Sequence, residues 1–142
     1  MTSHLIFPDV NVWLALASSR HVHRAVAKRW FESLEDEEPI FCRLTQMGLL
    51  RLLTTEAVMD VDVMTQRQAW SVYDSFVRDS GARFVYETRT LDDSFRRLSK
   101  LDMASPKDWA DSYLAAFALG AGARLVTFDK GLANRVKGSV AL

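Results

Sequence analysis

The sequence of 142 residues lacks several features that would assign it to a specialised class of protein. Its single cysteine, Cys42, excludes an internal disulfide and a zinc site built on cysteines, and it fits the reducing cytoplasm where we expect the chain to act. The longest apolar stretch, residues 113–123, is too short to span a membrane. The first apolar run follows no basic segment and is interrupted by Asp9, so we expect no signal peptide and no membrane anchor.

Charge of neither sign is in excess. Lysine and arginine number 18 and so do aspartate and glutamate, which gives a formal net charge of zero at pH 7. Binding to nucleic acid would therefore depend on a local basic patch. One candidate patch combines His21 and His23 with four basic side chains: Arg20, Arg24, Lys28 and Arg29. Solvated charges at the start of a helix are the alternative explanation.

Strands alternate with helices along the chain, without a repeat, a low-complexity tract or a linker. Apolar runs predict strands at residues 4–7, 39–42, 82–86, 123–128 and 139–142. Helical spacing predicts helices at residues 11–17, 21–34, 45–53, 65–78, 91–101 and 131–135, besides a central helix that begins at residue 106. This alternation is typical of an α/β fold with a central, mostly parallel sheet flanked by helices, and we expect residues 1–142 to form a single domain.

Residues 105–129 combine a capped helix, a tight turn and a buried strand. Ser105 is expected to be the N-cap of the helix, with Pro106 as its first residue and Asp108 completing a capping box. Asp108 also lies three positions before Asp111 on roughly the same helical face, so a role as a metal ligand is the alternative. The capping box explains Asp108 without further chemistry, and we favour it.

The turn and the strand after this helix are expected to bring two acids together. Gly120 and Gly122 supply a left-handed turn, and residues 123–128 form a continuous apolar strand of the kind that is covered on both faces. If helix and strand pack antiparallel, the start of the helix and the end of the strand lie at the same edge of the sheet. Asp111 and Asp129 then converge at that edge.

Asp9 has a similar position, because it follows the first expected strand, and ligands of parallel sheets bind beyond the carboxyl ends of the strands. Three carboxylates within a few ångströms repel one another by several kcal/mol per pair at an effective dielectric constant of about 20. A Mg²⁺ or Mn²⁺ ion removes this penalty, activates water and stabilises a phosphoryl group under attack. Each acid alone could instead cap a helix, but the three together favour a metal site.

Three segments of the chain resemble PIN-domain ribonucleases, and most of all the VapC toxins of prokaryotic toxin–antitoxin pairs: PDVNVWLALA, LTQMGLLRLLT and PKDWADSYLAAFALGAGARLVTFDKGL. The resemblance covers nearly the whole chain. It implies a PIN-like three-layer fold and a Mg²⁺- or Mn²⁺-dependent endoribonuclease that cleaves RNA with metal-activated water as the toxin of a type II pair. It also implies a homodimer and a small cognate, VapB-like antitoxin.

The resemblance assigns roles to individual residues. The family's catalytic and metal-binding acids are matched by Asp9, Asp111 and Asp129. Asn11 matches the polar residue beside the first acid, and Thr127 the one beside the last. Gln46 takes the place of the family's glutamate, and because a neutral amide adds no negative charge, we expect it to hydrogen-bond a ligand carboxylate or a metal-bound water. Arg51 matches an arginine after the second motif, whose role is either structural or functional.

Two other functions compete with this one. A degenerate PIN domain that acts only as a protein-binding module is supported by Gln46, and a metal-dependence assay on RNA separates it from the nuclease. An aspartate-nucleophile phosphatase also places an acid after its first strand. That class needs a second aspartate two positions later, where this chain has Asn11, and is therefore disfavoured.

Overall fold

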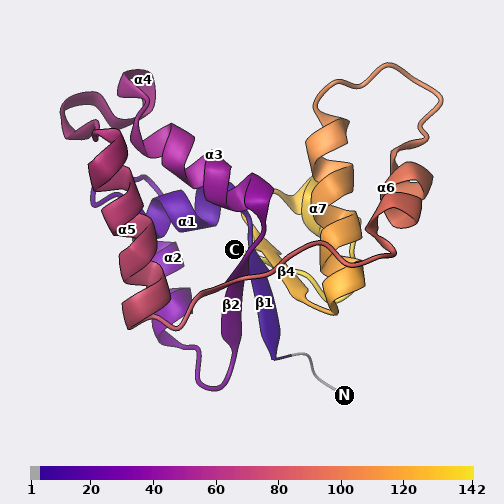
Figure 1. Ribbon diagram of the computed structural model, residues 1–142, viewed down its shortest axis with the longest axis horizontal. Coiled ribbons are helices and arrows are strands. Elements are labelled where there is room, and N and C mark those ends of the chain that lie inside the picture. The colour runs from indigo at the N-terminus through magenta and orange to yellow at the C-terminus, as the bar shows by residue number, and fades with distance from the viewer. Residues whose placement is uncertain (1–3) are drawn as a thin grey trace.

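The computed structural model describes residues 4–142 (Figure 1). Its strands are β1 (Leu5–Pro8), β2 (Glu38–Phe41), β3 (Arg83–Phe84), β4 (Arg124–Thr127) and β5 (Val140–Ala141). Its helices are α1 (Val10–Ala17), α2 (Arg24–Glu32), α3 (Arg43–Leu53), α4 (Glu56–Met59), the 3₁₀-helix η1 (Asp60–Asp62), α5 (Gln66–Asp79), α6 (Leu91–Ser99), α7 (Asp108–Ala121) and α8 (Lys130–Ala133). Within this described part of the chain, no helix is long and apolar enough to cross a membrane.

The strands of residues 4–142 form a five-stranded sheet in the order β3-β2-β1-β4-β5, and neighbouring strands pair in parallel. Pro8 at the end of β1 lies opposite Val126 in β4. The backbone N–H of Asp9 donates to the carbonyl of Val126 at 2.9 Å, which extends this pairing by one residue. The two central strands therefore end together, and Asp9 and Asp129 leave the sheet at the same edge.

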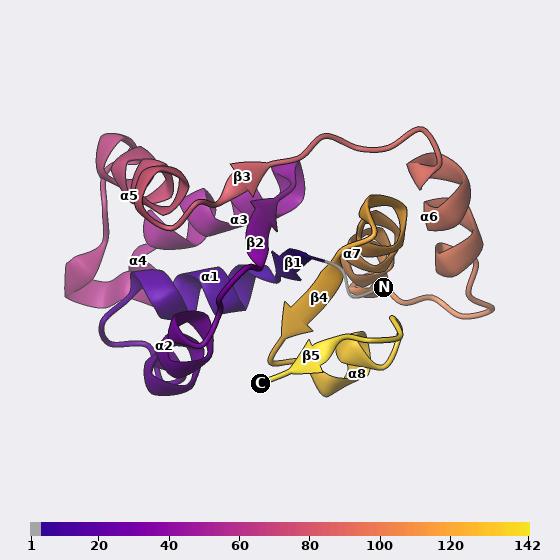
Figure 2. The ribbon, with the colours of Figure 1, turned by 90° about the horizontal axis from the view of Figure 1, so that it is seen from below.

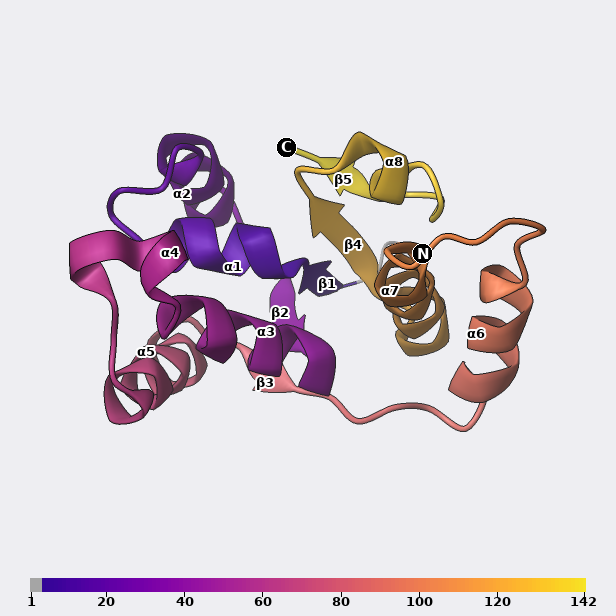
Figure 3. The ribbon, with the colours of Figure 1, turned by 90° about the horizontal axis from the view of Figure 1, so that it is seen from above.

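Both faces of the sheet are covered by helices. Because successive side chains of a strand point to opposite faces, each strand contributes to the packing on both sides. Toward α7 the sheet presents three fully buried side chains: Phe7, Ile40 and Leu125. The residues next to them in the strands face the opposite layer, which contains α1, α2, α3 and α5. These residues are Ile6, Phe41 and Val126. Figures 2 and 3 show the sheet between these two groups of helices. The expected three-layer α/β architecture is confirmed.

The two glycines near the end of α7 have different functions. Gly122 has φ of +64° and ends the helix in the left-handed conformation, as expected. Gly120 lies inside the helix, where a Cβ atom would be 2.6 Å from Thr88 Oγ1. The expectation that both glycines form the turn is therefore wrong, because Gly120 instead allows the connection before α6 to approach α7 closely.

The start of α7 also differs from the expected capping box. The helix begins at Asp108, and its N-cap, Lys107, makes no side-chain capping hydrogen bond. The N–H of Asp108 donates to the carbonyl of Ser105 at 3.1 Å, and the hydroxyl of Ser105 donates to the carboxylate of Asp108. Ser105 therefore holds Asp108 through a turn that precedes the helix.

Other helix boundaries shift by a few residues. Helix α3 begins at Arg43, two residues before the expected start, with Cys42 as its N-cap. Thr45 lies in the first turn, where its hydroxyl accepts from the N–H of Cys42 at 3.0 Å. Thr65 caps α5 in a capping box with Gln68. The short helices at residues 56–62 were not expected, since they are too brief to show helical periodicity.

Candidate active site

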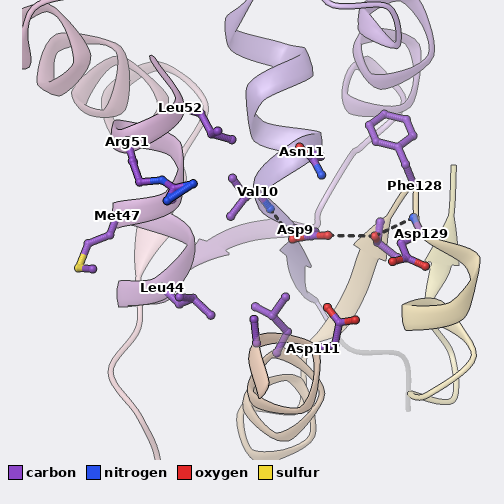
Figure 4. A pocket seen from close by; sticks show the side chains of 14 residues that line it. Asp9, Val10, Asn11, Leu44, Met47, Arg51, Leu52, Asp111, Phe128 and Asp129 are labelled. Atoms are coloured by element: carbon purple, nitrogen blue, oxygen red, sulfur yellow. Dashed lines mark hydrogen bonds between the residues drawn. The ribbon is translucent and has the colours of Figure 1, made fainter. Parts of the chain in front are cut away.

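A pocket of about 790 Å³ opens beyond the carboxyl ends of β1 and β4, between α1, α3 and α7. Asp9, Asp111 and Asp129 all line it, and Figure 4 shows their carboxylates turned toward the same space. Asn11 and Arg51 line the pocket as well. The structure thus brings the three acids together although they come from a strand end, a helix and a second strand end.

Asp9 is fixed by the junction of β1 with α1. It is the N-cap of α1, and its Oδ1 accepts from the N–H of Val10 at 2.6 Å. Its carbonyl accepts from the N–H groups of Val12 and Trp13 at 3.0 and 3.2 Å. Trp13 is fully buried, and its ring stacks on Phe41 with the centroids 4.0 Å apart. This packing sets the direction of α1 and so the position of the Asp9 carboxylate.

Thr127 connects two of the acids. Its side chain is fully buried at the end of β4, where the hydroxyl donates to Asp9 Oδ2 at 3.1 Å and accepts from the N–H of Asp129 at 3.0 Å. Asp129 in turn is the N-cap of α8, and its Oδ1 accepts from the N–H of Leu132 at 3.2 Å. One hydroxyl therefore orients both Asp9 and the backbone that carries Asp129.

Asp111 comes from the first turn of α7, and its carboxylate has no hydrogen bond or ion pair within residues 4–142. The turn is held by Arg135, which follows α8. Its guanidinium donates to the buried Ser112 hydroxyl at 2.8 Å and to the carbonyl of Leu98 at 3.1 Å, and it lies 3.8 Å from Asp108 Oδ1. No local motif distinguishes Arg135 in the sequence, so sequence patterns do not predict this role.

Asp108 does not line the acid pocket. Its carboxylate is occupied by Ser105 and faces Arg135, and its side chain borders a separate hollow beside Trp109. A role as a fourth metal ligand is therefore disfavoured, although Asp108 does not cap the helix in the expected way either.

The electrostatics of the pocket oppose ionisation of Asp9 and Asp111. Burial raises the pKa of Asp9, and the charges of Asp111 and Asp129 add to this effect, whereas the hydrogen bonds from Val10 and Thr127 oppose it. Burial also raises the pKa of Asp111, followed by the charges of Asp129 and Asp108. A cation in the pocket would compensate for the cost of holding these carboxylates ionised.

The donor set of the pocket fits a hard divalent cation, because it consists of carboxylate oxygens. The two hydrogen bonds to Asp9 occupy only part of the four lone-pair positions of a carboxylate. Within residues 4–142, no three histidine, cysteine, aspartate or glutamate side chains are already arranged to hold an ion. Gathering the acids around one cation therefore requires side-chain rotation, and Asp111 has no hydrogen bond that would resist it.

Gln46 does not lie beside the acids, which corrects our expectation. Its side chain is buried away from the pocket, where its Oε1 accepts from Arg43 Nη1 at 2.6 Å and its amide lies beside Tyr73 of α5. The reason is the helical period of 3.6 residues. The face of α3 toward the pocket contains positions 44, 47, 48, 51 and 52, and position 46 falls on the face toward α5.

The pocket face of α3 carries no acid and one cation. Arg51 extends toward the acids, as Figure 4 shows, and none of the acids of residues 4–142 forms an ion pair with it. One turn earlier, Gly48 allows α3 to approach α1, since a Cβ atom there would lie 2.7 Å from Val10 Cγ2. Helix α3 therefore forms a wall of the pocket without adding negative charge.

Comparison with known proteins gives a consistent family. A family model described as the PIN domain matches residues 6–138. The chain is 40% identical to ribonuclease VapC41 of Mycobacterium tuberculosis over 132 residues, which covers 88% of this chain and 89% of the relative. It is 32% identical to ribonuclease VapC39 of the same organism over 127 residues, covering 89% of each.

Solved structures agree in fold. The crystal structure of VapC20 from Mycobacterium tuberculosis, described as a toxin that cleaves the sarcin-ricin loop, superimposes with a TM-score of 0.65 at 18% identity, covering 91% of this chain and 93% of that one. The protein PAE2754 from Pyrobaculum aerophilum superimposes with a TM-score of 0.62 at 19% identity, covering 97% and 84%. With three acids at the carboxyl edge of a parallel sheet and close relatives among the VapC ribonucleases, the chain belongs to the PIN-domain family.

Proposed function

We propose that this protein is a metal-dependent endoribonuclease that acts in the cytoplasm as the toxin of a type II toxin–antitoxin pair. The observation that carries the proposal is the convergence of Asp9, Asp111 and Asp129 in one pocket. The similarity to relatives named ribonuclease VapC supports RNA as the substrate. A degenerate domain that only binds a protein partner is not favoured, because the acids are retained and the relatives are ribonucleases.

The carboxylates of Asp9, Asp111 and Asp129 would hold the metal, Mg²⁺ or Mn²⁺. When bound, it supplies an activated water and neutralises charge on the phosphodiester. Thr127 keeps Asp9 oriented, and the exposed amide of Asn11 at the rim can hydrogen-bond the substrate or the attacking water.

Arg51 adds a positive charge to the wall of the pocket that faces the three acids. It extends into the pocket from α3, opposite α7, and a phosphate between these two helices would meet its guanidinium. The acids and Arg51 thus provide complementary contacts for a phosphodiester and its metal. Sequence-specific recognition of RNA mostly targets single strands and loops, whose bases are accessible, so we expect the substrate to be single-stranded RNA or a loop.

Cleavage of RNA in the presence and absence of a chelator tests the mechanism. Cleavage with Mn²⁺ or Mg²⁺ that stops in excess EDTA is expected, and Asp9→Asn should reduce the rate by at least about tenfold because it removes a charged ligand. Cleavage that persists at full rate with EDTA would contradict the metal mechanism.

The proposed partner is a small VapB-like antitoxin that covers the pocket, with the toxin as a homodimer. Within residues 4–142 none of the three acids forms an ion pair, so the cluster is a suitable site for an arginine side chain of the antitoxin. Exposed apolar side chains on and near α2, namely Val22 and Val26, offer a contact for a partner helix. Expression of the toxin alone should slow growth and co-expression of the neighbouring small gene should restore it. Equal growth in both cultures would contradict the toxin assignment.

A further inference from the structure

A second hollow of about 340 Å³ continues the acid pocket across α3. It lies between α3 and the start of α5, and its walls include Met47 and Arg51, which also line the acid pocket. The two hollows therefore meet along one helix. Trp70 of α5 forms the outer end of this extension, which we call the α3–α5 groove.

Trp70 has an exposure that core packing does not explain. It is 46% exposed, and its ring contacts the buried Tyr73 only edge-on, with the centroids 5.8 Å apart and the planes at 88°. Met47 on the opposite wall is 55% exposed. A large aromatic ring beside a flexible apolar side chain, both open to solvent, is typical of a binding surface.

The charges of the groove favour a polyanion. Its lining contains no aspartate or glutamate, and its polar side chains are Thr54, Gln66 and Arg51. Arg51 lies where the groove meets the acid pocket, and no acid of residues 4–142 forms an ion pair with it. An unpaired arginine next to an exposed aromatic ring combines a phosphate contact with a stacking platform, the two elements that proteins use to bind single-stranded nucleic acid.

We propose that the α3–α5 groove holds the RNA strand where it leaves the acid pocket, with Arg51 on a phosphate and a base stacked on Trp70. This inference rests on the proposed ribonuclease function and adds a base-binding site to it. Stacking on one ring is tolerant of sequence, so Trp70 contributes affinity for any single strand and leaves the choice of the cleavage site to other contacts.

Equilibrium binding of two probes tests the stacking contact. The first is a fluorescently labelled single-stranded oligoadenylate of about 12 nucleotides, within the length range that single-strand sites occupy, and the second is an abasic ribose-phosphate strand of equal length. Binding is measured in the Asp111→Asn background, so that cleavage does not interfere. We expect Trp70→Ala to weaken binding of oligoadenylate by about 5- to 100-fold. Binding of the abasic strand should be unchanged, because that strand has no base to stack on the ring.

Two further variants serve as controls. Trp70→Phe keeps an aromatic face and should stay within a few-fold of the parent. Trp109→Ala removes a tryptophan that is 60% exposed on α7 and borders a different hollow, and it should bind both strands like the parent. In the active enzyme, Trp70→Ala should raise KM for RNA with little change in kcat, since the contact is remote from the reacting phosphate.

Three results would overturn the inference. Unchanged oligoadenylate binding in Trp70→Ala would show that no base stacks there, and equal weakening for both strands would show a structural effect instead. A shift in the sedimentation coefficient of Trp70→Ala alone would assign the groove to a contact between copies of the chain. Failure of the proposed nuclease gives a different pattern: base-dependent binding through Trp70 without any metal-dependent cleavage.

Discussion

The hydroxyl of Thr127 lies 3.1 Å from Asp9 Oδ2, although 118 positions separate the two residues in the chain. The contact exists because β1 and β4 are parallel neighbours that end together. It gives one lone pair of Asp9 to a partly buried hydrogen bond and leaves the carboxylate facing the pocket. Thr127 at the end of β4 thus helps to fix the orientation of Asp9 at the end of β1.

Thr127→Val tests this contact, because valine keeps the shape of threonine and removes the hydroxyl. The variant leaves the N–H of Asp129 without its partner and frees the Asp9 carboxylate to rotate. We expect a loss of about 1–3 kcal/mol in the free energy of unfolding and a ten- to hundredfold slower cleavage of RNA. Urea denaturation and RNA cleavage measure the two effects. Thr127→Ser retains the hydroxyl and should cleave within a few-fold of the parent; equal activity of the valine and serine variants would refute the positioning role.

Asp111→Asn tests whether the pocket holds the metal. Addition of Mn²⁺ or Mg²⁺ should raise the melting temperature of the parent, because an ion that binds only the folded state stabilises it. Asp111→Asn should lose most of this increase and slow cleavage by at least about tenfold. The matched control is Asp93→Asn, which removes an exposed acid of α6 outside the pocket. A metal-dependent increase of the same size in both variants would place the ion elsewhere.

From the raised pKa values of Asp9 and Asp111 we expect metal binding to depend on pH. A carboxyl whose folded-state pKa is raised above 3.8 keeps its proton at a pH where the unfolded chain has released it. Stability without metal therefore falls as pH rises from about 4 through these raised values, and this loss persists at higher pH. Because the metal competes with these protons, we expect its stabilising effect to disappear on acidification before the pH reaches the usual range of aspartate.

Thermal denaturation from pH 4 to pH 8, with and without Mn²⁺, measures this dependence. The difference between the two curves should grow with pH, and it should be smaller and flatter for Asp111→Asn than for the parent. A difference that is constant over this range would show that the acids of the pocket do not compete with the metal for protons.

The sequence predicted the sheet and its acids because both follow from local patterns. Buried parallel strands are continuous apolar runs, as in residues 123–128. An acid that directly follows such a run lies at the carboxyl edge of the sheet. The convergence of Asp111 with Asp129 needed only the assumption that α7 and β4 run antiparallel.

The contacts that support the site were harder to predict, because they depend on packing. Arg135 reaches Ser112 and Leu98 only after α6, α7 and α8 have assembled, and no spacing in the sequence encodes that contact. The orientation of Gln46 depends on the rotation of α3 about its axis, which is fixed by the burial of Leu49 and Leu53 against α1 and α5. A motif match gives the position of a residue along a helix but not the face on which it lies.

Gln46→Glu tests whether residue 46, which takes the place of the family's glutamate, can reach the metal site. In the structure the new carboxylate would lie next to Arg43, within the distance of the present 2.6 Å hydrogen bond, and would form an ion pair there. It would add no ligand to the pocket. We therefore expect Mn²⁺ affinity and the rate of cleavage to stay within about twofold of the parent, a free-energy change of less than about 0.5 kcal/mol.

Gln46→Ala complements this variant, because it removes a buried amide and leaves Arg43 without its acceptor. We expect a loss of about 1–2 kcal/mol in the free energy of unfolding, with cleavage by the folded protein changed by less than about threefold. Urea denaturation, Mn²⁺ titration and RNA cleavage of the three proteins side by side measure these effects. If Gln46→Glu bound Mn²⁺ tenfold more tightly, or alone switched cleavage on, residue 46 would have to reach the metal, and α3 would have to rotate to present it.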